Sequence, residues 1–177
     1  MDYDALYNLL SWTFVRPLAI ILNGLGRTRP YAKFNPPASF LGPTCMVGVY
    51  ASLLWLAKLP NETWTFAIIL LTCAFQHLTA RVFVSKSDFG IHYNILGYCM
   101  CPLILVALFV LLIKPPLLIL IFVECTGVVL STTASYLAYH DIYNFSDAKT
   151  KSRRILLFWP ILLMNIYFVS LLPASDE

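Results

Sequence analysis

Leu103-Ile104-Leu105-Val106-Ala107-Leu108-Phe109-Val110 is an unbroken apolar run inside a longer apolar stretch, Tyr93–Ile113. The hydrocarbon core of a bilayer is about 30 Å thick, so a helix that crosses it needs about 20 mostly apolar residues. Backbone groups in lipid must be paired internally, which leaves helices and closed barrels as the spanning structures. A barrel strand would alternate polar and apolar residues over about 10 positions, and this run does not. The stretch therefore predicts a transmembrane helix.

The same apolar pattern recurs along the chain. Hydrophobic residues make up 59% of the 177 residues and charged residues 12%, with a mean hydropathy of +0.75. A soluble domain normally carries about a quarter charged residues. The candidate spans are Phe40–Ala57, Trp64–Val84, Tyr93–Ile113, Leu117–Tyr139 and Ile155–Leu172. Most links between them are short, so we predict an all-α polytopic membrane helical bundle of five transmembrane helices, in one domain over residues 39–172.

The lysines and arginines fall on alternate sides of these spans. With the N-terminus in the cytosol, the cytosolic cations are Arg16, Arg27, Arg29, Lys33, Lys86, Lys149, Lys151, Arg153 and Arg154. Only Lys58 and Lys114 fall on the other side. Positive charge accumulates on the cytosolic side of membrane proteins, so the N-terminus is predicted to be cytosolic and the C-terminal tail, residues 173–177, lumenal. The net charge of +3 gives no reason to expect a nucleic-acid partner.

The first 38 residues form a cytosolic N-terminal segment in this scheme. Its leucines and isoleucines recur at helical spacing, whereas Arg16-Pro17 at its centre disfavours a spanning helix. We therefore predict an amphipathic helix lying at the membrane interface, in preference to a sixth span or a disordered tail.

Residues that could support chemistry are scattered. The five cysteines, which lie inside predicted spans, are Cys45, Cys73, Cys99, Cys101 and Cys125. Cysteine buried in this way behaves as a small apolar residue. His77, His92 and His140 lie on three different segments and are expected to form no ligand pair. Phosphate-binding and nucleophile motifs are missing from the sequence. The sequence therefore predicts no enzyme, no cofactor and no metal site.

Ionisable and amide groups inside spans are candidates for function by default. Glu124 lies about 10 Å from the lumenal end of the fourth span, at about 1.5 Å per residue. Asn165 in the last span is expected to be its hydrogen-bond partner, because the two are nearest in depth. Arg81 lies near the cytosolic end of the second span and is expected to reach the headgroups there.

Small residues predict where helices approach closely. Gly127, Ser131 and Ser135 recur every four residues on the fourth span, and Gly48 and Ser52 do so on the first. Such spacing lets two helix backbones approach each other. The pattern is compatible with packing inside the bundle and with assembly between bundles.

Prolines are expected to interrupt three spans. They are Pro43 near the start of the first, Pro102 in the third and Pro160 in the fifth. Each removes a backbone donor and can kink a helix.

Four blocks of sequence together resemble the Yip domain family, the Rab-interacting membrane proteins of the early secretory pathway. Asn94–Leu103, with Gly97, Tyr98 and Pro102, resembles the family's "LGYSLLPL" stretch. Phe40–Pro43 resembles its aromatic-x-Gly-Pro motif through Gly42 and Pro43, and Ser131–Ser135 its hydroxyl-rich stretch. Phe158–Leu171, with Pro160, is similar to the "YPIFLLYIYFLSL" ending of one Golgi branch.

The resemblance implies a non-enzymatic membrane scaffold in vesicle-mediated transport between ER and Golgi and in Golgi maintenance. Such a protein would recruit or organise Rab GTPases, work in homo- or hetero-oligomers with Yip or Yif relatives, and reside in Golgi or ER membranes. The alternative is a small transporter or channel-like membrane protein. A transporter would be expected to show internal repeats or broken helices with polar residues at the midplane.

Overall fold

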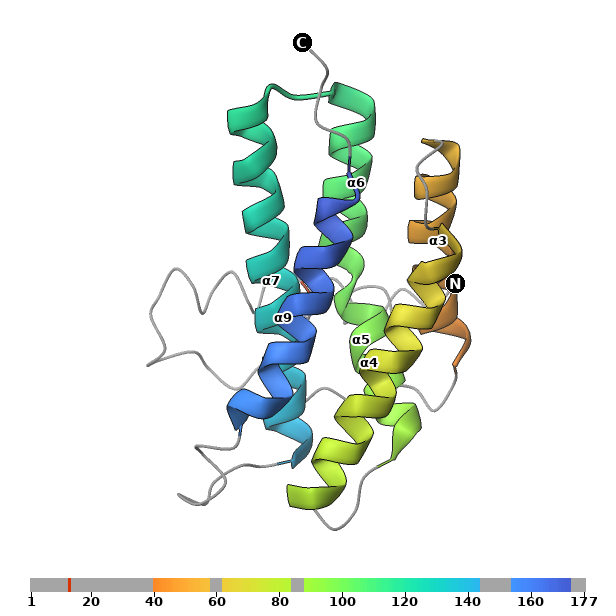
Figure 1. Ribbon diagram of the computed structural model, residues 1–177, viewed down its shortest axis with the longest axis vertical. Coiled ribbons are helices and arrows are strands. Elements are labelled where there is room, and N and C mark those ends of the chain that lie inside the picture. Colours follow the sequence, from red (N-terminus) through yellow and green to blue (C-terminus); the bar gives the residue numbers. More distant parts are fainter. Residues whose placement is uncertain (1–12, 14–39, 58–61, 84–87, 144–153, 173–177) are drawn as a thin grey trace.

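Helices form all the regular structure that the computed structural model describes, which covers residues 13, 40–57, 62–83, 88–143 and 154–172 (Figure 1). The helices there are α3 (Leu41–Leu56), α4 (Glu62–Phe83), α5 (Phe89–Cys99), α6 (Cys101–Ile113), α7 (Leu117–Tyr143) and α9 (Arg154–Ser170). The all-α prediction is confirmed. The predicted interfacial helix in the first 38 residues and the tail 173–177 lie outside the described residues.

The helices coincide with the five apolar stretches. Three units are long and apolar enough to cross a membrane: Trp64–Val82, Phe89–Ile113 and Leu117–His140. Helices α3 and α9 are apolar but shorter, with 16 and 17 residues. The chain is therefore a multi-pass membrane protein.

The predicted third span is two helices. α5 ends at Cys99 and α6 begins at Cys101, with Met100 between them. Pro102 has no N–H to continue the helical ladder. The Met100 amide instead donates to the Gly97 carbonyl at 3.3 Å, one residue short of the α-helical spacing.

The other two prolines do not end a helix. Pro43 lies in the first turn of α3, where a backbone N–H has no intrahelical acceptor in any case. α9 runs through Pro160 without a break.

α5 also begins one turn earlier than predicted. The Asp88 carboxylate accepts a hydrogen bond of 2.9 Å from the Gly90 amide and so caps the helix. Asp is a favoured residue at this position because it satisfies an amide that has no helical partner.

α6 and α7 form a hairpin closed by three residues. Lys114 ends α6 in the left-handed conformation, with φ 48° and ψ 61°, and its amide donates to the Val110 carbonyl at 2.9 Å. Pro115 and Pro116 follow, and α7 starts at Leu117. Figure 1 shows this turn lying beyond the end of α9.

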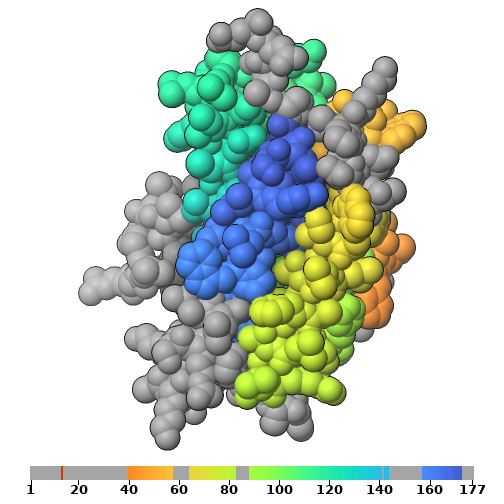
Figure 2. All heavy atoms as spheres, viewed as in Figure 1, coloured from red at the N-terminus to blue at the C-terminus, as the bar shows by residue number. Residues whose placement is uncertain are grey.

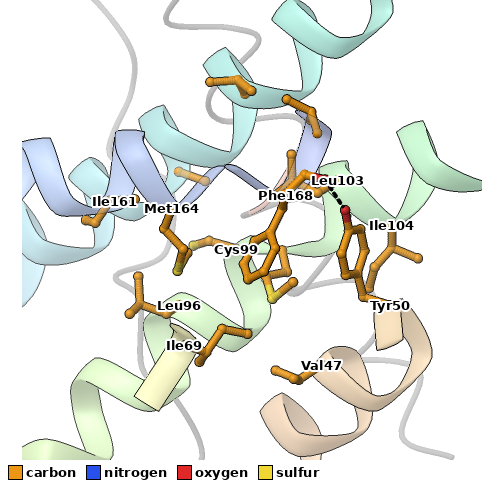
Figure 3. Packing of buried hydrophobic residues seen from close by; sticks show 14 of the residues in the cluster. Val47, Tyr50, Ile69, Leu96, Cys99, Leu103, Ile104, Ile161, Met164 and Phe168 are labelled. Carbon is orange, nitrogen blue, oxygen red and sulfur yellow. Dashed lines mark hydrogen bonds between the residues drawn. The ribbon is translucent and has the colours of Figure 1, made fainter. Parts of the chain in front are cut away.

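The α5–α6 unit is the most enclosed part of the bundle. Within Phe89–Ile113, 61% of an 18-residue apolar stretch is buried inside the bundle. The buried share of such a stretch is 33% in each of the other two long units. Figure 3 shows the core around it, where side chains of α3, α4, α5, α6 and α9 meet. The fully buried Tyr50 of α3 donates its hydroxyl to the Phe168 carbonyl of α9 at 2.6 Å. On another face α9 lies between α4 and α7 (Figure 2).

The two predicted small-residue faces differ. Gly127, Ser131 and Ser135 are buried on the side of α7 that packs against α5 and α6. A Cβ placed on Gly127 would lie 2.5 Å from Cγ2 of Val106. The Ser131 hydroxyl donates to the Cys99 carbonyl at 2.6 Å, beside the α5–α6 break.

The Gly48 face does not take part in internal packing. A Cβ placed on Gly48 would meet no atom within 4 Å, and Ser52 is exposed. The α7 row is therefore a contact inside the bundle, whereas Gly48 and Ser52 point outward.

A leucine at position 131 is expected to destabilise the protein. Ser131→Leu removes the hydrogen bond to Cys99 and forces a larger side chain between α7 and α5, at an expected cost of about 1–3 kcal/mol. Ser52→Leu is the matched control, because Ser52 is exposed on α3. Thermal unfolding in mild detergent measures both. Equal unfolding midpoints for the two variants would contradict the packing described above.

Candidate functional site

The two strongest motif blocks of the sequence contact each other in the structure. A Cβ on Gly42 of α3 would overlap the Tyr98 hydroxyl and ring of α5. A Cβ on Gly97 of α5 would overlap the Pro43 side chain and lie 2.8 Å from the Pro43 Cα. Each helix therefore contributes a glycine that receives a bulky residue of the other. We call these four residues the reciprocal junction.

The contact between α3 and α5 continues toward the start of both helices. The rings of Phe40 and Tyr93 have centroids 5.9 Å apart. The Tyr93 hydroxyl also shares a hydrogen bond of 3.0 Å with the Thr44 hydroxyl. A Cβ on Gly90 would lie 3.1 Å from Cζ of Phe40. Glycine and aromatic side chains thus set the distance between the two helices over several turns.

The opposite side of α5 holds a buried polar cluster. His92 is fully buried; its Nδ1 lies 2.9 Å from the Tyr139 hydroxyl and its Nε2 lies 3.0 Å from the Tyr143 hydroxyl. The two tyrosine rings, one turn apart on α7, are stacked with centroids 6.0 Å apart. These hydrogen bonds join α5 to the last turns of α7. We call His92, Tyr139 and Tyr143 the histidine cluster.

A second histidine lies beside this cluster. The His77 ring of α4 is 5.9 Å from the His92 ring and 6.1 Å from the Phe89 ring, centroid to centroid. The sequence analysis did not predict a contact between these two histidines, because they lie on different segments of the chain. α4 and α5 are antiparallel neighbours, and residues 77 and 92 are nearly equidistant from the link between them. Their similar distance from this link is the feature of the sequence from which the contact could have been predicted.

The cluster has the chemistry of a structural contact. A neutral imidazole can donate through one nitrogen and accept through the other, and two hydroxyls can complement both. Among the described residues no three His, Cys, Asp or Glu side chains group as metal ligands. Cys73 and Cys99 are buried and free. In the described part of the chain, the hydrogen bonds of this cluster join α5 to α7.

The intramembrane polar residues pair differently from the prediction. The buried Asn165 amide donates to the Thr132 hydroxyl at 2.9 Å, so the expected pairing of Asn165 with Glu124 does not form. Thr132 lies about two turns farther along α7 than Glu124, about 12 Å. The prediction assumed that all spans end at one level, whereas the α6–α7 turn extends past α9 (Figure 1).

Two further polar residues lie on α4. Arg81 is exposed in its last turn. Gln76, which the sequence reading did not select, is fully buried and donates to the Leu157 carbonyl of α9 at 2.6 Å.

Comparison with known proteins identifies a family. A family model described as the Yip1 domain matches residues 7–172. The match therefore includes the reciprocal junction, the histidine cluster and all six described helices. No solved structure matches the chain.

Adding one methyl group at Gly97 is expected to disrupt the reciprocal junction. Gly97→Ala places a Cβ against the Pro43 backbone, which cannot move aside as a side-chain end could, and we expect a loss of about 1–3 kcal/mol. Gly48→Ala is the control, because its surroundings are open and alanine favours a helix over glycine by about 1 kcal/mol. Unfolding midpoints in detergent report both effects. Stability at least equal to the original protein in Gly97→Ala would show that the contact does not constrain the helices.

A second pair of variants tests how much the histidine cluster contributes to stability. Tyr139→Phe takes away the hydroxyl that contacts His92 Nδ1, and losing the partner of a buried polar group costs about 1–3 kcal/mol. Tyr136→Phe is the matched control, since the Tyr136 ring packs edge-on to Phe158 with centroids 6.2 Å apart. Only Tyr139→Phe is expected to lower the unfolding midpoint clearly. Equal effects would mean that the hydroxyl contributes no more than the ring.

Proposed function

Because the chain belongs to the Yip1 domain family, we propose that it is a membrane scaffold in vesicle-mediated transport between ER and Golgi and in Golgi maintenance. It would recruit or organise Rab GTPases and related membrane proteins. Yip1 family proteins are non-enzymatic membrane proteins linked to vesicle trafficking. The observation that carries the proposal is the family match from residue 7 to residue 172, which covers the membrane helices and most of the N-terminal segment.

The proposed orientation places five spans in the membrane, the N-terminus in the cytosol and the C-terminus in the lumen of Golgi or ER. Figure 1 shows the end of α4, the start of α5, the end of α7 and the start of α9 at the same end of the bundle. The links at that end carry Lys86, Lys149, Lys151 and Arg153, whereas Lys114 occupies the α6–α7 turn at the other end. The charge distribution supports a cytosolic assignment for the first end.

The interhelical hydrogen bonds support a scaffold over a transport path. Three buried polar side chains each bond to a group on a different helix: Tyr50 to Phe168, Gln76 to Leu157, and Asn165 to Thr132. A transport path needs polar groups that can exchange partners with a solute. These groups hold pairs of helices together and so favour a fixed platform.

The recruiting surface in this proposal consists of the cytosolic pieces, which are residues 1–39, the link 85–92 and the loop 141–154. The histidine cluster and the exposed Arg81 lie at the end of the bundle that carries the two links. In this proposal the N-terminal segment and the basic loop, residues 141–154, lie on the same side of the membrane. Partners in this scheme are Rab GTPases on the cytosolic side and Yip or Yif relatives within the bilayer.

Removing residues 1–27 is expected to abolish capture of Rab GTPases while leaving the bundle inserted. The truncated protein, purified in mild detergent, is tested against a panel of purified Rab GTPases, and protease protection checks its insertion. Deleting residues 173–177 is the control, because that tail lies on the lumenal side in this proposal and its loss leaves capture unchanged. Full capture by a correctly inserted 1–27 deletion would refute recruitment through the N-terminal segment.

A further inference from the structure

Glu124 is an acidic side chain within an otherwise apolar length of α7. It lies in the candidate span Leu117–His140, about 10 Å along the helix from Leu117. The apolar side chains around it differ in exposure: Ile121 is 49% exposed and Phe122 is 72% exposed, whereas Leu120 and Val128 are buried. The carboxyl group is therefore placed at hydrocarbon depth, near the α6–α7 end of the bundle.

The described part of the bundle supplies no hydrogen-bond or ion-pair partner for this carboxyl group. Within the described residues, the hydrogen bonds and ion pairs do not include Glu124, and Asn165 is already bonded to Thr132. Glu124 is only partly buried, between the buried Leu120 and Val128 on one side and the exposed Cys125 on the other. A carboxylate in hydrocarbon costs several kcal/mol unless it meets a cation or a hydrogen-bond donor.

The cations of the described helices lie at the wrong depth to pair with the Glu124 carboxylate. Arg81 is in the last turn of α4, at the opposite end of the bundle. Lys114 is in the α6–α7 turn, so it lies about 10 Å nearer the membrane surface than Glu124. A second copy of the chain in the same orientation would bring its described cations to those same depths. Among the described residues, therefore, no lysine or arginine lies at the depth of Glu124.

We propose that Glu124 is an intramembrane docking point for a partner transmembrane helix that carries a lysine or arginine at the same depth. The partner helix would lie along the exposed Ile121–Cys125 side of α7 and place its cation on the Glu124 carboxylate. A charge pair in hydrocarbon selects both the partner and its vertical register. This site is at the opposite end of the bundle from the proposed cytosolic recruiting surface, so it adds a second and separate contact.

The test uses a defined probe in place of a natural partner. The full chain, labelled with a donor dye, is reconstituted into phosphatidylcholine vesicles with an acceptor-labelled synthetic polyleucine helix that carries one lysine about 10 Å from one end. We expect energy transfer to show association about 3- to 20-fold stronger than with an all-leucine helix, the range given by interhelical polar contacts in membranes.

Variants of the chain separate the carboxylate from its surroundings. Glu124→Leu is expected to reduce association with the lysine helix to that of the all-leucine helix, whereas Glu124→Asp retains it. Glu124→Lys is expected to reverse the preference, rejecting the lysine helix and binding a glutamate helix. Thr126→Leu is the matched control and leaves binding unchanged, because the exposed Thr126 donates only to the Phe122 carbonyl of its own helix at 2.8 Å. Circular dichroism confirms that each variant is folded.

Three outcomes would overturn the proposal: equal binding of the lysine and all-leucine helices, equal binding by the Glu124→Leu variant, or a Glu124→Lys variant without reversed preference. Energy transfer between two labelled copies of the chain that depends on Glu124, without binding of the lysine helix, would assign the carboxyl group to self-association instead. The vesicles contain no cytosolic protein. Failure of Rab capture therefore leaves this result unaffected, and failure here leaves Rab recruitment unaffected.

Discussion

The close approach of α3 and α5 is the contact on which the rest of the bundle depends. Gly42 and Gly97 each leave room for a bulky residue of the opposite helix, so the two backbones can meet only where both glycines are present. Apolar residues lose little by facing lipid instead of one another, which makes shape the main determinant of helix pairing in a bilayer. The reciprocal junction is such a shape, and it also explains why two distant sequence blocks belong together.

α5 carries that constraint to the remaining helices. Its far side bonds to α7 through His92 near one end and accepts the Ser131 hydroxyl at Cys99 near the other. A rotation of α5 that loosened the junction would therefore also displace hydrogen-bond partners on α7. Buried polar groups bond in few geometries, so they turn an approximate apolar packing into a defined one.

The sequence predicted the helices well because their signal is local. Continuous apolar runs located every described helix, and Pro102 located the break in the third span. Contacts between distant segments were not predicted, since they depend on relative height and rotation. Asn165 was assigned to Glu124 because all spans were assumed to end at one level, and the contact of His77 with His92 was missed because each was read on its own segment. The motif blocks were recognised separately in the sequence. Their contact with each other depends on how α3 packs against α5, which the sequence did not indicate.

The turn at Lys114 gives the bundle an uneven stiffness. A left-handed residue followed by Pro115 and Pro116 has few alternative conformations, so the turn restricts how α6 and α7 can move relative to each other. At the other end of α6, the break at Met100 has lost part of its helical ladder and offers a natural place to bend. Bending there would also displace the Cys99 carbonyl, so the Ser131 hydroxyl that bonds to it ties any flexing of α6 to α7.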